Sequence, residues 1–116
     1  MENEEFAPEI IFGHRRYLCP LDLALEVMGG KWKTMMIYRL RGGALRSSEL
    51  QRRMAGISNK MFTQAARELE RDGLLRRTVY AQVPPRVEYA LTARGAALLP
   101  VLEQLAGWGT TLAEQE

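Results

Sequence analysis

The side chains best suited to recognising another molecule lie in residues 57–73, where apolar residues recur at the spacing of one amphipathic helix. Its apolar face comprises Phe62, Ala65, Ala66 and Leu69, and its polar face comprises Asn59, Lys60, Thr63, Gln64 and Arg67. The polar face carries no acidic residue before Glu68. Amide and cationic side chains pair with base edges in the DNA major groove, and threonine contacts the thymine methyl. The pattern therefore predicts base recognition, with an ordinary solvated helix surface as the alternative.

Two residues mark the ends of this predicted helix. Ser58 suits the N-cap, where a serine hydroxyl accepts a hydrogen bond from a backbone N–H of the first turn. Gly73 follows the last periodic residue, and a left-handed backbone at that position costs least for glycine. Because a helix N-terminus attracts anions, Ser58 is also a candidate contact to a DNA phosphate.

Cys19, the single cysteine, is the second candidate for chemistry. It precedes Pro20 at the start of a predicted helix, where the helix dipole favours the thiolate. One interpretation is a redox or electrophile sensor. With one cysteine per chain, such a sensor requires a Cys19–Cys19 bond between two chains or a small-thiol cap. The alternative is a small buried residue at a dimer seam.

Enzymatic and metal chemistry find little support in the sequence. One cysteine and one histidine leave no ligand set for a structural zinc ion. No carboxylate pair, Gly-rich phosphate loop or nucleophile–base pair occurs at a defined spacing, and His14 fits an exposed arm. We therefore expect no enzyme, no metal and no cofactor.

Length and charge narrow the class of protein further. The 116 residues suffice for one small domain of ordinary globular composition. No apolar run is long enough to cross a bilayer, the N-terminus is acidic, and a single cysteine fits a reducing compartment, so we expect an unprocessed cytoplasmic protein without a membrane partner. Although the net charge is only +2, residues 46–77 hold eight basic and four acidic residues, which favours a polyanionic partner for this region.

The segments on either side of residues 57–73 predict a winged helix-turn-helix. A short helix from Ser48, with Gln51 completing a capping box, is joined to the 57–73 helix by a turn that contains glycine. Residues 75–80 and 87–91 alternate in polarity around two prolines, which indicates a hairpin. We expect an α+β fold, mostly α-helical.

We divide the chain into an N-terminal arm, residues 1–18, and one DNA-binding and dimerisation domain, residues 19–116. The arm is acidic and carries an apolar cluster at Ile10, Ile11 and Phe12. It is either a disordered tail or an arm that packs on a partner subunit.

The first and last predicted helices carry more apolar surface than a small winged-helix core can cover. Pro20 opens the first helix, which is apolar enough to be buried on more than one side. Thr92 caps the last helix, which Pro100 should kink. We expect a second copy of the chain to cover Leu21, Leu25, Leu98, Leu102, Leu105 and Trp108.

Five arginines outside the 57–73 helix are candidate DNA contacts. Four of them, which would add phosphate contacts and salt sensitivity, are Arg52, Arg53, Arg76 and Arg77. Arg86, held by the two prolines before it, is placed to reach a minor groove, where narrow A·T tracts attract arginine. The alternative for Arg86 is a salt bridge to Glu88 or Glu70.

Several short motifs, in order along the chain, resemble one known family. They are Cys19-Pro20, Gly29-Gly30-Lys31-Trp32, Glu49-Leu50, Ile57-Ser58 with Lys60-Met61, Glu68-Leu69 with Asp72-Gly73-Leu74, the run VPPRVEY at residues 83–89, and Leu91-Thr92. From Cys19 to Trp108 the chain resembles the HxlR-type transcriptional regulators, a branch of the MarR-like winged-helix proteins. The resemblance implies a homodimer on palindromic or repeated operator DNA, with N- and C-terminal dimerisation helices. It also implies a recognition helix at residues 58–73, a wing at residues 78–91 and, as in some members, thiol sensing at the position of Cys19.

Two other functions stay open. A winged-helix module that binds proteins without touching DNA would explain the apolar helix surfaces, but it would not explain the acid-free polar face. A small-molecule effector bound between the first helix, the last helix and Trp32 would add an input to DNA binding. The alternative for Trp32 is an anchor in the core.

Overall fold

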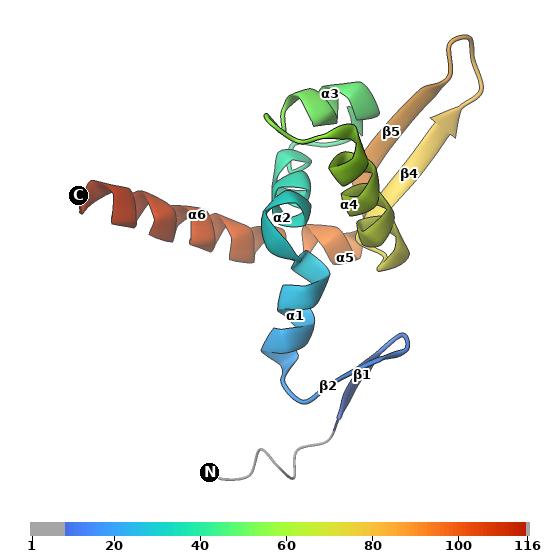
Figure 1. Cartoon of the computed structure of the whole chain (residues 1–116). Coiled ribbons are helices and arrows are strands. Elements are labelled where there is room, and N and C mark those ends of the chain that lie inside the picture. Colours follow the sequence, from blue (N-terminus) through green and yellow to red (C-terminus); the bar gives the residue numbers. More distant parts are fainter. Residues whose placement is uncertain (1–8, 116) are drawn as a thin grey trace, which may run out of the picture.

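A computed structural model describes residues 9–115, so residues 1–8 of the predicted arm lie outside the described residues. The elements are β1 (Ile10–Phe12), β2 (Arg15–Tyr17), α1 (Pro20–Met28), α2 (Gly30–Arg39), β3 (Leu45–Arg46), α3 (Ser47–Arg52), α4 (Asn59–Arg71), β4 (Leu75–Tyr80), β5 (Arg86–Leu91), α5 (Ala93–Ala96) and α6 (Leu99–Glu114). Figure 1 shows α2, α3, α4 and the β4–β5 hairpin in one body, from which α1 and α6 project. The predicted winged helix-turn-helix is confirmed, with α3 and α4 as the helix pair and β4–β5 as the wing.

The core lies where α2 and α4 pack against each other and against the sheet. Its fully buried side chains are Met36, Ile37, Leu40, Leu50, Met54 and Leu69. Trp32 is half-buried and packs against this core, as expected of an anchor. Phe62 of α4 and Tyr89 of β5 meet edge to face with their ring centroids 6.1 Å apart, a geometry that aromatic pairs favour. The core therefore fixes the position of α4 relative to the wing.

The wing belongs to a three-stranded sheet with the strand order β3-β5-β4. The antiparallel register pairs Leu75 with Leu91 at the base and Tyr80 with Arg86 near the tip. Pro84 lies in the turn between the strands, where its missing N–H removes no bond from the ladder. The hairpin predicted from alternating polarity is confirmed.

The start of α3 differs from the prediction. The helix begins at Ser47 with Arg46 as its N-cap, and no side chain caps it, so the capping box of Ser48 and Gln51 was wrong. The reason is that Arg46 is also the last residue of β3, paired with Glu88, and the strand leads directly into the helix. Gln51 instead donates its amide N–H to Asn59 Oδ1 at 2.5 Å.

The last helix also differs from the prediction, because it is two helices. Thr92 caps α5 as expected, with its hydroxyl oxygen accepting a hydrogen bond from the Gly95 N–H at 3.1 Å. Helix α5 ends at Ala96, and α6 starts at Leu99. Pro100 therefore lies in the first turn of α6, where its missing N–H costs nothing, and does not kink a helix interior.

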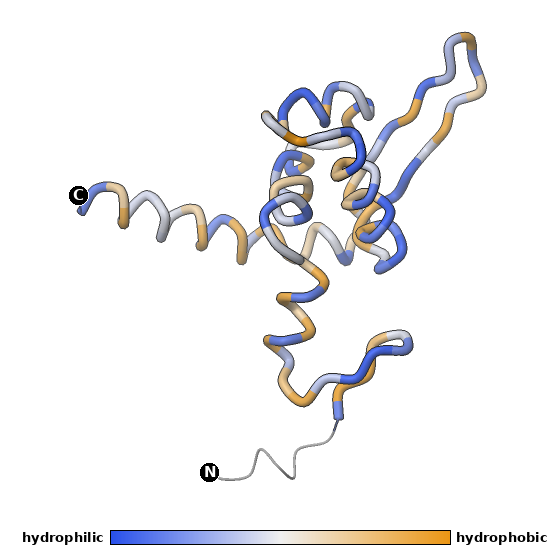
Figure 2. Tube along the Cα trace, in the orientation of Figure 1, coloured by the Kyte–Doolittle hydropathy of each residue, from blue (hydrophilic) through white to orange (hydrophobic). Residues whose placement is uncertain are grey.

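The helices that project from the body leave apolar side chains uncovered. We expected α1 to be buried on more than one side, but none of its residues is buried within the chain, and Leu21 and Leu25 are 62% and 54% exposed. Figure 2 shows hydrophobic residues recurring along α1 and α6, away from the body. Within residues 9–115 no helix is long and apolar enough to cross a membrane.

The described part of the predicted arm is a short hairpin, β1–β2, that leads into α1. Arg15 Nη2 donates a hydrogen bond of 2.7 Å to Asp72 Oδ1 at the C-terminal end of α4. The Phe12 ring lies 5.1 Å from the Arg15 guanidinium and 5.4 Å from that of Arg94. The hairpin is thus tied to the winged domain through polar and cation–π contacts.

Candidate nucleic-acid interface

Both ends of α4 are closed by the residues predicted from the sequence. Ser58 is the N-cap, and its hydroxyl oxygen accepts a hydrogen bond from the Met61 N–H at 3.1 Å. At the other end Gly73 has a φ of +83°, and the Gly73 and Leu74 N–H groups donate to the Glu70 and Leu69 carbonyls. This pair of bonds is the Schellman motif, which glycine favours. The helix is therefore held at a defined length and direction.

The structure separates the two faces of α4 as the spacing predicted. Its apolar face is buried and comprises Phe62, Ala65, Ala66 and Leu69. Its opposite face lines an open hollow on the molecular surface and comprises Asn59, Lys60, Thr63, Gln64, Arg67 and Glu68. We call the first five of these residues the α4 polar face. Small alanines on the buried side let the helix pack closely on the core, and the longer polar side chains stay on the surface.

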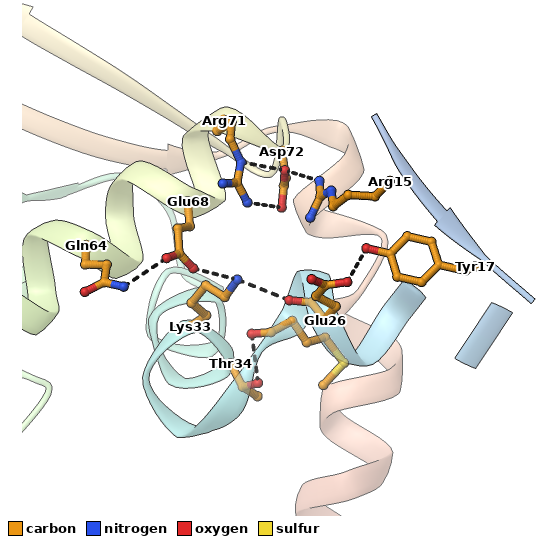
Figure 3. A network of polar contacts seen from close by, with 10 residues as sticks. Arg15, Tyr17, Glu26, Lys33, Thr34, Gln64, Glu68, Arg71 and Asp72 are labelled. Atoms are coloured by element: carbon orange, nitrogen blue, oxygen red, sulfur yellow. Dashed lines mark hydrogen bonds and ion pairs between the residues drawn. The ribbon is translucent and has the colours of Figure 1, made fainter. Parts of the chain in front are cut away.

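Glu68 joins the α4 polar face to α2, a feature that the sequence analysis missed. Lys33 Nζ of α2 lies 3.0 Å from Glu68 Oε1, and Gln64 Nε2 donates to Glu68 Oε2 at 3.1 Å. Figure 3 shows Glu68 between these two partners. The hydrogen bonds from Lys33 and then Gln64 lower the pKa of Glu68, so this carboxyl group is ionised at neutral pH. The four-residue spacing of Gln64 and Glu68 signalled their contact, but nothing in the sequence placed Lys33 beside them.

The arginines of α3 share one acidic partner. Arg53 Nε lies 2.8 Å from Glu49 Oε2, and Arg52 pairs with the other carboxylate oxygen. The hydrogen bonds from Arg53 and then Arg52 lower the pKa of Glu49. Because these ion pairs are exposed to water, they are weak and leave both guanidinium groups able to exchange Glu49 for a phosphate. Arg77 is exposed on β4.

Arg86 is held on the wing by its neighbours. Its guanidinium carbon lies 4.2 Å from the centroid of the Tyr80 ring, and its Nε lies 3.4 Å from Glu88 Oε2. Of the two partners considered for a salt bridge, the structure has Glu88. The side chain also lines a polar cleft of about 420 Å³ between the start of α3 and the wing tip, together with Arg46, Ser47, Ser48, Gln51 and Gln82. This cleft was not predicted from the sequence, because its walls come from two segments far apart along the chain.

Cys19 is the N-cap residue of α1, the helix that Figure 1 shows projecting from the body on the side away from the wing tip. It is exposed, and its backbone carbonyl accepts a hydrogen bond from the Asp22 N–H at 3.0 Å. Within one chain, therefore, it is not the buried residue of our second interpretation; burial would require a second copy. Among residues 9–115 no group of three or more His, Cys, Asp or Glu side chains could hold a metal ion.

The residues expected at a dimer interface fall into two sets. Leu21, Leu25, Leu105 and Trp108 are exposed, whereas Leu98 is half-buried and packs against the core. Leu102 is only 3% exposed, so it belongs to the core and was wrongly assigned to the interface. It precedes Leu105 by one helical turn and lies near the start of α6, a helix that contacts α2.

An apolar groove of about 290 Å³ lies near the place expected for a small effector. It runs between β1, α1, α5 and the residues around them, and it is lined by Phe12, Leu23, Ala24, Val27, Met28, Leu74, Arg94, Ala97 and Leu98. Trp32, which we expected to border such a pocket, is not among the lining residues.

Comparison with known proteins places these features in a family. The model of the HxlR-like helix-turn-helix family matches residues 27–116. YkvN of Bacillus subtilis strain 168, described as an uncharacterized HTH-type transcriptional regulator, is 46% identical over 102 residues, covering 88% of this chain and 86% of its own. A crystal structure of YtcD, a putative HTH-type transcriptional regulator, superimposes with a TM-score of 0.78 at 46% identity, covering 83% of this chain and 98% of its own. The redox regulator HypR in its oxidized form matches with a TM-score of 0.76 at 44% identity, covering 80% and 96%.

The fold and the α4 polar face define a winged helix-turn-helix protein of the MarR-like type. Within that class, the chain belongs to the HxlR-like helix-turn-helix family. It is a transcriptional regulator with a helix-turn-helix. Membership of this family of regulators implies DNA as the partner.

Proposed function

We propose that this chain is a sequence-specific regulator that binds operator DNA as a homodimer. The observation that carries the proposal is the α4 polar face. It presents two amides, a hydroxyl and two cations on a helix that is capped at both ends and backed by a buried apolar face. A helix of this kind fits the major groove, where residues near its N-terminus contact base edges.

The surrounding elements supply contacts to the DNA backbone. In this proposal Ser58 and the exposed arginines Arg52, Arg53 and Arg77 contact phosphates, which position the protein without reading sequence. Arg86, stacked on Tyr80, is presented by the wing toward the adjacent minor groove. In this proposal a phosphate strand of the DNA passes through the polar cleft between α3 and the wing tip, which Arg46 helps to line.

The dimeric part of the proposal rests on the exposed apolar side chains of α1 and α6. Leu21, Leu25, Leu105 and Trp108 would be covered by the same surfaces of a second copy. A two-fold dimer places two copies of α4 on half-sites about 34 Å apart, one turn of the DNA helix.

A salt titration tests the DNA-binding part of the proposal. The protein is titrated against the DNA upstream of its own gene, with random duplex as competitor. Binding that survives the competitor and weakens with salt with a slope of several phosphates per dimer is the expected result. If binding to both duplexes is equal and weak, the measurement is repeated with duplexes selected from a random pool. Equal and weak binding there too would favour the protein-binding module instead.

Two substitutions test the assignment of roles within the interface. Gln64→Ala is expected to change the sequence preference, because Gln64 lies on the α4 polar face. Arg53→Ala is expected to weaken binding to all duplexes to a similar extent, because a phosphate contact carries no sequence information. A uniform loss from both substitutions would show that the base-reading residues are assigned wrongly.

A thiol input at Cys19 is a second proposal. Two observations support it: Cys19 is exposed at the start of α1, and the similar structure of HypR is that of a redox regulator. Oxidation would join two Cys19 residues across the dimer or add a small thiol to each. Mass spectrometry of the native protein after diamide treatment tests it, and an unmodified Cys19 would rule it out.

A further inference from the structure

The contact between Gln64 and Glu68 fixes the direction of an amide on the α4 polar face. Gln64 Nε2 donates to Glu68 Oε2 at 3.1 Å, and Figure 3 shows the carbonyl oxygen of Gln64 turned away from that carboxylate. The reverse orientation would place an amide oxygen against a carboxylate, two acceptors without a proton between them. While Glu68 is ionised, the amide therefore keeps one orientation.

Lys33 holds Glu68 in place for this role. Its Nζ lies 3.0 Å from Glu68 Oε1 and donates a second hydrogen bond, of 3.2 Å, to the backbone carbonyl of Glu26 at the end of α1. The Lys33 side chain is only 11% exposed, so the ammonium group is confined between these partners. Each Glu68 oxygen thus has one donor, Lys33 on one side and Gln64 on the other.

The backbone is shaped to let Lys33 reach this position. Gly29 has a φ of +49°, and a Cβ at that residue would lie 2.8 Å from Lys33 Nζ. Any side chain at residue 29 would therefore occupy the path of the lysine. The Gly29–Gly30 break between α1 and α2, which looks like a simple helix stop in the sequence, also clears the way for the ion pair.

Lys33 also removes an electrostatic obstacle. Glu68 lines the same open hollow as the α4 polar face, and an unpaired carboxylate there would repel the DNA phosphates. The ammonium group of Lys33 compensates the charge from the protein side and leaves the outer edge of Gln64 accessible.

We propose that Lys33 and Glu68 are positioning residues that orient the Gln64 amide to select an adenine in each half-site. The proposal rests on the proposed DNA-binding function. With one N–H committed to Glu68, the Gln64 amide presents its oxygen and its remaining N–H on one edge. This acceptor–donor edge matches the N6 amino group and N7 of adenine. Guanine offers acceptors at both O6 and N7, so the fixed amide oxygen meets an acceptor there.

The experiment measures base preference for matched lysine variants of α2. Duplexes bound by the wild-type protein are selected from a random pool, and binding is then measured to duplexes that differ only at single positions. The variants are Lys33→Met and Lys31→Met, which remove the same charge from the same helix. Lys31 is exposed beside the Trp32 ring, 4.7 Å from its centroid, and the cation that pairs with Glu68 is Lys33, which makes Lys31 the control.

Lys33→Met is expected to reduce the preference for adenine over guanine about tenfold at one position per half-site, because a bidentate amide contact carries discrimination of that order. Lys31→Met is expected to leave this preference unchanged. Both variants should lose affinity for random duplex, and Lys33→Met should lose more, because it leaves the Glu68 carboxylate without its cation. In a Gln64→Ala background, Lys33→Met should produce no further loss of preference. Lys33→Arg, which keeps a cation next to Glu68, should retain part of it.

Glu68→Gln provides a second, independent variant that does not depend on the stability of Lys33→Met. The new amide at residue 68 can either donate to Gln64 or accept from it, so the Gln64 amide is no longer held in one orientation and the preference for adenine should fall. Loss of the negative charge should raise the affinity for random duplex. The proposal is overturned if Lys33→Met or Glu68→Gln keeps the preference, or if Lys33→Met reduces it further without Gln64. A wild-type protein that selects no duplex at all would overturn the proposed function, and this proposal with it.

Discussion

Helix α4 and the pair α1 and α6 are amphipathic in different ways. The apolar face of α4 is buried inside one chain, and both of its ends are capped. In α1 no residue is buried, and in α6 only Leu102 is, while neither helix has a side-chain cap at its N-terminus. The comparison indicates that one chain suffices to position α4, whereas α1 and α6 are complete only when another surface covers them.

The free energy at stake differs accordingly. Burying one large apolar side chain contributes about 1.5 to 3 kcal/mol, so α4 already has this contribution from each of Phe62 and Leu69. Trp108 is 63% exposed on α6 and has most of its contribution still available to a second copy. We therefore expect substitutions on α4 to affect unfolding at any protein concentration, and those on α6 to affect self-association.

The largest effect is expected for Leu69→Ala in the buried face of α4. Leu69 is fully buried in the core, so the substitution leaves a cavity and should lower the free energy of unfolding by about 3 kcal/mol. Urea denaturation followed by circular dichroism measures this. Met61→Ala on the exposed side of the same helix is the control and should cost far less. Equal costs would mean that α4 does not pack as described.

Trp108→Ala is expected to act on self-association instead. An aromatic residue at the centre of an interface contributes about 2 kcal/mol, which corresponds to roughly a thirtyfold weaker dimer. Sedimentation equilibrium measures the dissociation constant, with Val83→Ala at the exposed wing tip as a control for the loss of surface apolar area. An unchanged dissociation constant in Trp108→Ala would place the interface elsewhere.

The same contrast explains which parts of the structure were predictable. The caps and faces of α4 follow from local chemistry. Ser58 and Gly73 each form a hydrogen bond with a backbone group three residues away, and the helical period of 3.6 residues separates the two faces. The hairpin follows likewise from its period of two and its prolines. These predictions needed no knowledge of the rest of the chain.

The errors arose where distant segments decide the outcome. Ser48 looked like an N-cap, but the pairing of β3 with β5 moved the start of α3 to Ser47. Leu102 shares a helical face with Leu105, yet only Leu102 is buried, in a helix that contacts α2. The link from Lys33 to Glu68 was missed for the same reason, because it joins α2 to α4 across the core.

An intermediate effect is expected at Asp72, which joins α4 to the N-terminal hairpin. Burial opposes ionisation of its carboxyl group, but hydrogen bonds from Arg71 and Arg15 outweigh burial and lower its pKa. A lowered folded-state pKa stabilises the fold above the ordinary aspartate pKa of about 4, and this stability is lost as the pH falls through the folded-state pKa. Asp72→Asn should therefore cost about 1.5 kcal/mol at pH 7 and progressively less below pH 4.

Urea denaturation at several pH values measures this dependence. Glu49→Gln is the control, because its ion pairs with Arg52 and Arg53 are exposed and contribute little to the free energy of unfolding. A cost of Asp72→Asn that stays the same from pH 7 to pH 2.5 would contradict the role given to its charge.

The smallest effect is expected for the N-cap of α4. Ser58→Ala removes the hydroxyl that accepts from the Met61 N–H, which should lower the free energy of unfolding by about 1 kcal/mol. Ser47→Ala is the matched control, because α3 begins at Ser47 with Arg46 as its N-cap and no side-chain cap bond. Thermal unfolding of both variants compares a capped helix start with an uncapped one in the same protein. If the two substitutions cost the same, the hydrogen bond of Ser58 does not stabilise α4. The N-terminus of α4 would then be no more stable than those of α1 and α6, which have no side-chain cap.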